Sequence, residues 1–229
     1  MGARGRPLLI VLAITVGACA LQTPLSPEAA AGMKGRRLTT LVRRAPAFYG
    51  PAPEDSFAGG LSVALAMEIA GERIVRDNGL VDPALSVAGQ VAATLAARYG
   101  LQTSPPVVTA VVHDDPTAIF SAAPEADLVL DVWTDSWGVK TFADGDESKY
   151  RATYEVEVRI IDAKALRSID GRAGVVIAEA SCNSPGETPP NAPNRAQFFD
   201  DGARLLKKDL DAAARFCVAD FQSRILNAK

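Results

Sequence analysis

Apolar and polar residues alternate strictly between Tyr150 and Ile160. A period of two predicts a strand with one face in the core and the other in water, as in antiparallel sheets. Four further runs rich in apolar and β-branched residues predict more strands, at 36–44, 105–115, 127–139 and 175–182. The positions expected to face the core on the alternating strand are Tyr150, Ala152, Tyr154, Val156, Val158 and Ile160.

Two neighbouring helices are predicted in the first half of the chain. Residues 57–79 form the first, which is almost uncharged from Gly59 to Gly71, so we expect it to be buried against a sheet. The second follows Asp82, an N-cap residue, and ends at Gly100. The residues on its expected core face are Leu85, Val91, Ala92 and Leu95.

The longest predicted helix runs from Arg195 to about Leu226. Its apolar stripe consists of Phe199, Ala203, Leu206, Leu210, Ala213, Cys217 and Phe221. The order of elements is strand, two helices, strand, short helix, three strands and long helix. This order predicts the α+β class: a mixed, largely antiparallel sheet of about four to five strands, with helices packed on one face and a long C-terminal helix.

The first 18 residues have the order of a bacterial secretory signal. Arg4 and Arg6 form a positive region, and residues 8–16 form an apolar run that is too short to span a bilayer as a helix. We therefore expect a signal peptide at 1–18, a tether at 19–35, and a single α+β periplasmic domain at 36–229.

The four residues Val16-Gly17-Ala18-Cys19 resemble the bacterial lipobox. The resemblance implies that the Cys19 thiol receives a diacylglyceryl group, for which a thiolate is nucleophilic enough, and that the leader is cut before Cys19. Ala20 resembles the pattern of lipoproteins sent to the outer membrane, so we expect a lipid anchor on its periplasmic side. Two alternatives stay open: cleavage before Leu21 without a lipid, and an incidental cysteine in an uncleaved helix.

The net charge of the chain bears on whether it binds nucleic acid. The chain of 229 residues carries 24 Lys and Arg against 27 Asp and Glu, a formal net charge of −3. It lacks the basic stripe that neutralises nucleic-acid phosphates, so we expect no nucleic-acid partner. The sequence also contains no phosphate-binding glycine loop, and no cofactor is expected.

The cysteines and the single histidine limit redox and metal chemistry. In an oxidising compartment an even pair, Cys182 and Cys217, favours a disulfide that closes a loop of about 35 residues; two buried free thiols are the alternative. The sequence has no CxxC motif, so no thiol or imidazole metal site is expected. His113, beside Asp114 and Asp115, fits a turn that caps the next helix better than it fits a catalytic base.

A partial match to a calcium loop occurs in the segment 142–150. Asp144, Asp146 and Glu155 stand where such a loop places acids, but Lys149 occupies the position that requires glycine. The dipeptide Asp144-Gly145 is better explained as a hairpin turn between two strands. We therefore expect no metal here.

Two aspartates and two tryptophans follow one another in "DVWTDSW", residues 131–137. Asp131 and Asp135 flank Trp133, and Trp137 is next at the same strand parity. Carboxylates beside aromatic residues can bind or cleave sugars. We favour an exposed strand face that binds a partner, since aromatic residues are enriched at protein interfaces.

Past the leader, three segments resemble uncharacterised proteobacterial envelope lipoproteins: "NGLVDPALSVAGQVAATLAARYGL", "ADLVLDVWTDSWGV" and "AEASC". The architecture is also similar to that of small accessory lipoproteins of ABC-type transport and secretion systems. We expect a lipid-anchored periplasmic envelope protein with a non-enzymatic binding or assembly-accessory role and an envelope protein as partner. The alternative is a periplasmic carboxylate-dependent hydrolase or a glycan-binding protein.

Overall fold

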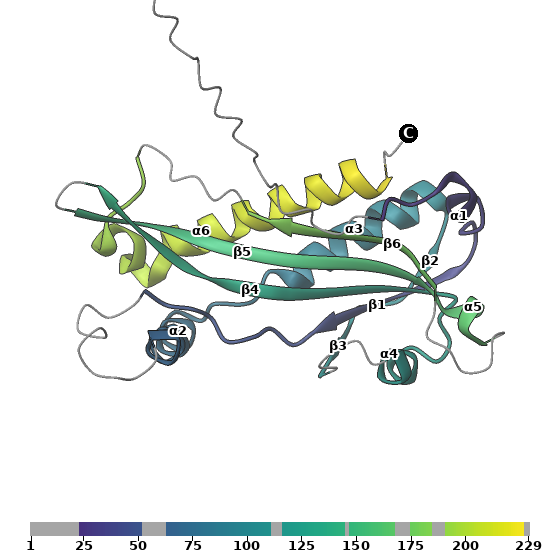
Figure 1. Cartoon of the computed structure of the whole chain (residues 1–229), viewed down its shortest axis with the longest axis horizontal. Coiled ribbons are helices and arrows are strands. Elements are labelled where there is room, and N and C mark those ends of the chain that lie inside the picture. Colours follow the sequence, from purple (N-terminus) through teal and green to yellow (C-terminus); the bar gives the residue numbers. More distant parts are fainter. Residues whose placement is uncertain are drawn as a thin grey trace, which may run out of the picture.

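A computed structural model describes residues 23–51, 63–110, 116–144, 147–167, 175–184 and 191–226. Its centre is a six-stranded sheet in the order β2-β1-β4-β5-β6, with β3 also paired to β1 (Figure 1). β1 is parallel to β2, β3 and β4, whereas β4, β5 and β6 are antiparallel neighbours. The strands are β1 (Arg37–Arg43), β2 (Gln102–Thr103), β3 (Val107–Thr109), β4 (Leu128–Asp144), β5 (Glu147–Asp162) and β6 (Val175–Asn183).

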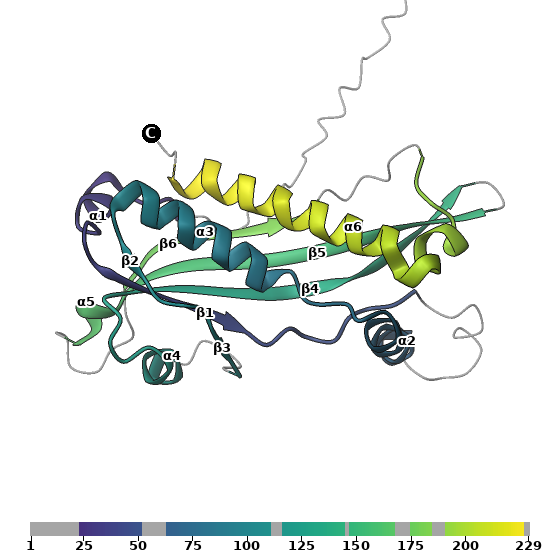
Figure 2. The same ribbon diagram turned by 180° about the vertical axis from the view of Figure 1, so that it is seen from behind.

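Among the described residues, six α-helices accompany the sheet. They are α1 (Pro27–Ala31), α2 (Val63–Asn78), α3 (Ala84–Tyr99), α4 (Pro116–Ala122), α5 (Ala163–Arg167) and α6 (Arg195–Phe221), which continues into one π-helical turn, η2 (Gln222–Leu226). α3 and α6 lie side by side along one face of the sheet (Figure 2). The α+β class, the mixed sheet and the long C-terminal helix are therefore confirmed.

The main core lies between the sheet and the pair α3 and α6. Every second side chain of β5 enters it, as the alternating pattern predicts; these are Tyr150, Ala152, Tyr154, Val156, Val158 and Ile160. A smaller apolar cluster on the opposite face joins Ile119 of α4, and Ala123 just after it, to Leu41, Val129 and Ile161 of the sheet.

β4 contains a bulge that shifts its side-chain parity. Its register with β5 shifts by one residue between Thr134 and Ser136, so Asp135 is the extra residue. After the bulge, Trp137 faces the main core, although Trp133 faces the opposite side of the sheet. The expectation that 131, 133, 135 and 137 share one exposed face is therefore wrong, because a bulge adds one residue to a period of two.

α2 is not buried against the sheet, contrary to expectation. Only Gly71 of this helix is buried, while Leu65 and Ile69 are 44% and 48% exposed. The helix instead packs on the segment that follows β1, where Gly50 N–H donates to the Met67 carbonyl (2.9 Å). A Cβ at Gly71 would overlap the carbonyl of Phe48, so the close approach requires glycine.

The other two long helices follow their predicted stripes with local corrections. Leu85 of α3 is 46% exposed, and the buried face of that helix begins at Val87 and Ala88. In α6 the backbone leaves helical geometry from Asp200 to Ala203, where three consecutive residues have positive φ. This kink separates a short first turn from the long part that lies along the sheet.

Part of the segment expected as a tether is packed on the domain. Thr23 forms an isolated antiparallel bridge with Glu179 at the outer edge of β6. Leu25 and Met33 are buried in the main core. Within the described ranges, no helix is long and apolar enough to cross a membrane.

Candidate functional site

The structure joins Cys182 of β6 to Cys217 of α6 in a disulfide, with 5.5 Å between the two Cα atoms. Both residues are buried in the main core. The bond links the edge of the sheet to the long helix across 35 residues of chain. Cys19, the expected lipidation site, lies outside the described residues.

Asp131 lies in a buried ionic cluster and not on a binding face. Its side chain is 1% exposed and bonds two guanidinium groups, Arg43 at 2.5 Å and Arg159 at 2.9 Å. Both cations also contact the ring of Trp133, at 4.2 and 4.6 Å from its centroid. Trp133, which is half-buried, therefore packs against the ion pairs of its own sheet.

The remaining two residues of this segment diverge. Trp137 is buried, packs edge-on against Phe48 and donates its indole N–H to the Pro46 carbonyl (2.9 Å). Asp135 is exposed at the bulge. The structure thus does not bring Asp131 and Asp135 together as a catalytic carboxylate pair.

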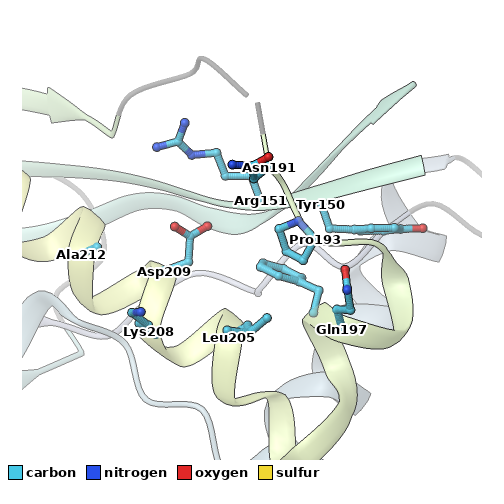
Figure 3. A pocket seen from close by; sticks show the side chains of 10 residues that line it. Tyr150, Arg151, Asn191, Pro193, Gln197, Leu205, Lys208, Asp209 and Ala212 are labelled. Carbon is cyan, nitrogen blue, oxygen red and sulfur yellow. The ribbon is translucent and has the colours of Figure 1, made fainter. Parts of the chain in front are cut away.

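A pocket of about 410 Å³ lies between the first half of β5 and the long part of α6 (Figure 3). β6 pairs with β5 only from Glu155 onward, so the pocket lies where the sheet has no further strand. Arg151 and Asn191 stand on its strand side, and Leu205 and Asp209 on its helix side. The end of one strand thus creates the space.

Groups from outside the sheet bond the edge of β5 at this pocket. Tyr150 N–H donates to the Pro193 carbonyl (2.9 Å), and Ala152 N–H donates to the Asp209 carboxylate (2.8 Å). Figure 3 shows that carboxylate directed from α6 toward the strand. The helix side chain therefore satisfies a backbone donor that a neighbouring strand would otherwise bond.

The floor of the pocket is aromatic and its mouth is polar. Tyr150 and Phe198 stack with 6.3 Å between ring centroids. Arg151, Lys208 and the side-chain amide of Asn191 supply donors at the opening. An apolar floor with a few polar groups is typical of sites that bind a small ligand or an anchor side chain of a partner.

A second polar feature lies at the start of α3. Asp82 Oδ1 accepts from Ala84 N–H (3.1 Å) and from the Thr134 hydroxyl (2.6 Å), which is 3.4 Å from the hydroxyl of Tyr154. Burial raises the pKa of Asp82 because it disfavours the charged carboxylate. Burial likewise raises the pKa of Tyr154, so its hydroxyl keeps its proton.

Comparison with known proteins gives no family. Neither the protein-family models nor the curated proteins contain a match to this sequence.

Several solved structures resemble this chain over most of its length, at low sequence identity. The hypothetical protein CT253 from Chlamydia trachomatis is 10% identical with a TM-score of 0.37, and the match covers 85% of this chain and 99% of that one. The PelC dodecamer from Paraburkholderia phytofirmans is 15% identical with a TM-score of 0.34, and the match covers 83% of this chain and 89% of that one. Lipoprotein GNA1162 from Neisseria meningitidis is 15% identical with a TM-score of 0.25, and the match covers 80% of this chain and 99% of that one. Similarity at this level carries no inference about function.

The sequence analysis missed the pocket beside β5. Its strand residues belong to the alternating pattern, and its residues Leu205, Asp209 and Ala212 flank the core stripe of α6 on one side. The one available signal for this pocket was Asp209, a charged residue in the long helix. Nothing in the sequence indicates that its carboxylate bonds the backbone of Ala152. His113 lies outside the described residues, and among those described no three His, Cys, Asp or Glu side chains form a metal-binding group.

Proposed function

We propose that this protein is anchored by a lipid on Cys19 at the periplasmic side of the outer membrane. It acts there as a non-enzymatic binding or assembly-accessory protein for another envelope protein. The leader supports the anchor, and the disulfide between Cys182 and Cys217 supports an oxidising compartment. The anchor requires processing before Cys19, which leaves a chain without the signal peptide.

The pocket between β5 and α6 carries the binding part of the proposal. It combines an aromatic floor with polar groups at an open mouth. Asp131 and Trp137, in contrast, are buried and bonded within the domain, so a partner cannot reach them in this fold. We therefore place the partner at Leu205, Lys208 and Ala212 of the α6 wall.

The anchor is tested by the intact mass of protein purified from bacterial membranes. We expect the mass of residues 19–229 plus acyl chains, with alkylation of Cys182 and Cys217 only after reduction. A mass that begins at Leu21 and contains no lipid would contradict the anchor. Alkylation before reduction would contradict the disulfide.

The binding site is tested by photo-crosslinking in intact cells. A photoreactive residue at Ala212, which lines the pocket, should give a discrete adduct, and the substitution Leu205→Arg in the same chain should remove it. Ala219 is the matched control, because it is exposed on α6 outside the pocket. Equal labelling from both positions, or none from Ala212, would contradict binding through this pocket.

A further inference from the structure

A second groove, of about 490 Å³, lies between α6 and the segment that joins α2 to α3. Its α6 residues, Lys207, Leu210 and Ala214, lie on the opposite side of the helix from Leu205 and Ala212, because successive residues are 100° apart. The groove is therefore separate from the pocket beside β5.

The walls of this groove are mainly apolar. Leu80, Leu210 and Ala214 are buried beneath it. Val81 and Leu85 stand at its rim and are 76% and 46% exposed. Apolar side chains exposed beside a cavity gain free energy when an apolar group covers them, about 25 cal/mol for each Å² removed from water.

One carboxylate in the lining of this groove has an oxygen that is unpaired among the described residues. Asp82 lines it, and both of its hydrogen bonds, from Ala84 and Thr134, are made by Oδ1. Oδ2 accepts no hydrogen bond or ion pair from any residue that the structure describes. An unpaired carboxylate oxygen beside apolar walls is stabilised by a bound cation, which can form a charge-assisted hydrogen bond with it.

The neighbouring charges leave this carboxylate without a cation. Lys207 lines the groove but makes no ion pair with Asp82 within the described ranges. Asp211, the other acid of the lining, is paired with Arg215 one turn along α6. On the sheet side Asp82 faces the neutral hydroxyls of Thr134 and Tyr154.

We propose that this groove binds a small organic cation, an ammonium group on an apolar chain. The ammonium donates to Asp82 Oδ2, and the chain lies against Leu80, Leu85 and Leu210. The preference for a cation comes from the Asp82 carboxylate, whose Oδ2 has no partner among the described residues; beside apolar walls a charge-assisted hydrogen bond is stronger than in water. The proposal depends neither on the anchor at Cys19 nor on the pocket beside β5.

Three six-carbon probes test it at neutral pH: hexylammonium, hexanol and hexanoate. Titration of the isotope-labelled protein, followed by backbone amide shifts of residues 79–86, gives each affinity. We expect hexylammonium to bind about tenfold more tightly than hexanol, and hexanoate to bind most weakly. Equal affinity for hexylammonium and hexanol, or no binding of any probe, would overturn the proposal.

Two substitutions separate charge from shape. Asp82→Asn keeps an oxygen that accepts from Ala84 and Thr134, and it should lower the affinity for hexylammonium to that for hexanol. Asp211→Asn is the matched control, since it removes an equal charge from the same groove but leaves Asp82 intact; it should change the affinity less than threefold. Thermal unfolding of both variants checks the fold. Loss of affinity in Asp211→Asn alone would place the cation elsewhere and overturn the assignment.

A third substitution tests the sign of the charge that is bound. Lys207→Gln removes the cation of the groove, so binding of hexylammonium should be unchanged or tighter. If the groove instead selected anions, this variant would lose affinity for hexanoate while hexylammonium remained weak. Because Lys207→Gln can be shown to be folded by thermal unfolding, that result would contradict the proposal.

Discussion

Asp131 stabilises the fold through two cations that approach it from neighbouring strands. Replacing it with asparagine removes the shared negative charge between Arg43 and Arg159 in a buried cluster. Removal of one partner of a buried ion pair costs about 3–5 kcal/mol, so we expect a loss of this size in the free energy of unfolding. Urea denaturation measures it.

Asp135→Asn is the natural control for that prediction, because its side chain is exposed at the bulge. We expect a change within about 0.5 kcal/mol. Similar effects of the two substitutions would mean that Asp131 is not held in the ionic cluster.

The buried carboxyl of Asp82 predicts a pH dependence of stability. Its pKa is raised in the folded state, so the folded protein keeps this proton to higher pH than the unfolded chain does. Stability from this group is greatest below the ordinary carboxyl pKa of about 3.9 and falls as pH rises through the raised value. Asp82→Asn cannot ionise, and it should gain stability relative to the native protein over that range.

Two other carboxyls, whose pKa values are lowered in the folded state, have the opposite effect on the pH dependence of stability. Both are present in the native protein and in Asp82→Asn. The Arg36 guanidinium lowers the pKa of Asp162, and the backbone N–H of Arg37 lowers the pKa of Asp127. Their stabilisation is lost on acidification in either protein, so it cancels in the difference. Unfolding free energies of the native protein and Asp82→Asn from pH 3 to 8 give that difference, and parallel curves would contradict the prediction.

Single residues show where sequence patterns stop being informative. The alternation predicted that Tyr154 faces the core, and it does. Alternation could not place Asp131, since a charged residue at that parity is normally assigned to solvent. Its two arginine partners lie 88 and 28 positions away in sequence, and no local rule links them.

At the scale of elements, α2 depends on one glycine for its position. Gly71→Ala would place a methyl group on the carbonyl of Phe48, so the helix must shift and the protein should lose about 1–3 kcal/mol. Gly89→Ala in α3 is a matched control, because no atom lies within 4 Å of its Cβ. It should stabilise the protein by about 0.5–1 kcal/mol through helix propensity.

Chemical denaturation of both variants tests this pair, and amide exchange within α2 reports on its docking. Faster exchange is expected in Gly71→Ala and no change in Gly89→Ala. Equal stability of the two variants would show that α2 does not pack closely on the segment after β1.

Elements with a long regular period were predictable, and those set by a local irregularity were not. The alternating strand and the stripe of α6 follow from periodicity alone. The bulge at Asp135 breaks a period without a proline or a glycine. The kink from Asp200 to Ala203 contains Gly202, but the apolar stripe continues across it, so the consequences for Trp137 and α6 required the structure.

At the scale of the whole molecule, one disulfide ties the sheet to its covering helix. A closed loop of 35 residues lowers the entropy of the unfolded chain, and its loss should cost about 3–4 kcal/mol. The double substitution of Cys182 and Cys217 with alanine, followed by chemical denaturation, measures this. Addition of reductant should destabilise the native protein and leave the double variant unchanged; equal sensitivity of the two proteins would contradict the bond.

The overall class followed from the order of the elements, whereas the pocket beside β5 did not. The pocket lies where β6 ends and β5 continues. The sequence of one strand does not show where its pairing with a neighbouring strand begins or ends.

If Cys19 carries the proposed lipid, the bridge between Thr23 and Glu179 limits the distance between the domain and the membrane. Its two backbone bonds, 2.9 and 2.8 Å, hold the chain at the outer edge of β6. With a lipid on Cys19, four peptide units, at most about 14 Å, would connect that edge to the bilayer surface. β2, at the far edge of the sheet, lies four strand spacings away, roughly 19 Å. The molecule would then have a membrane-near edge and a membrane-far edge, and its approach to other envelope components would be oriented accordingly.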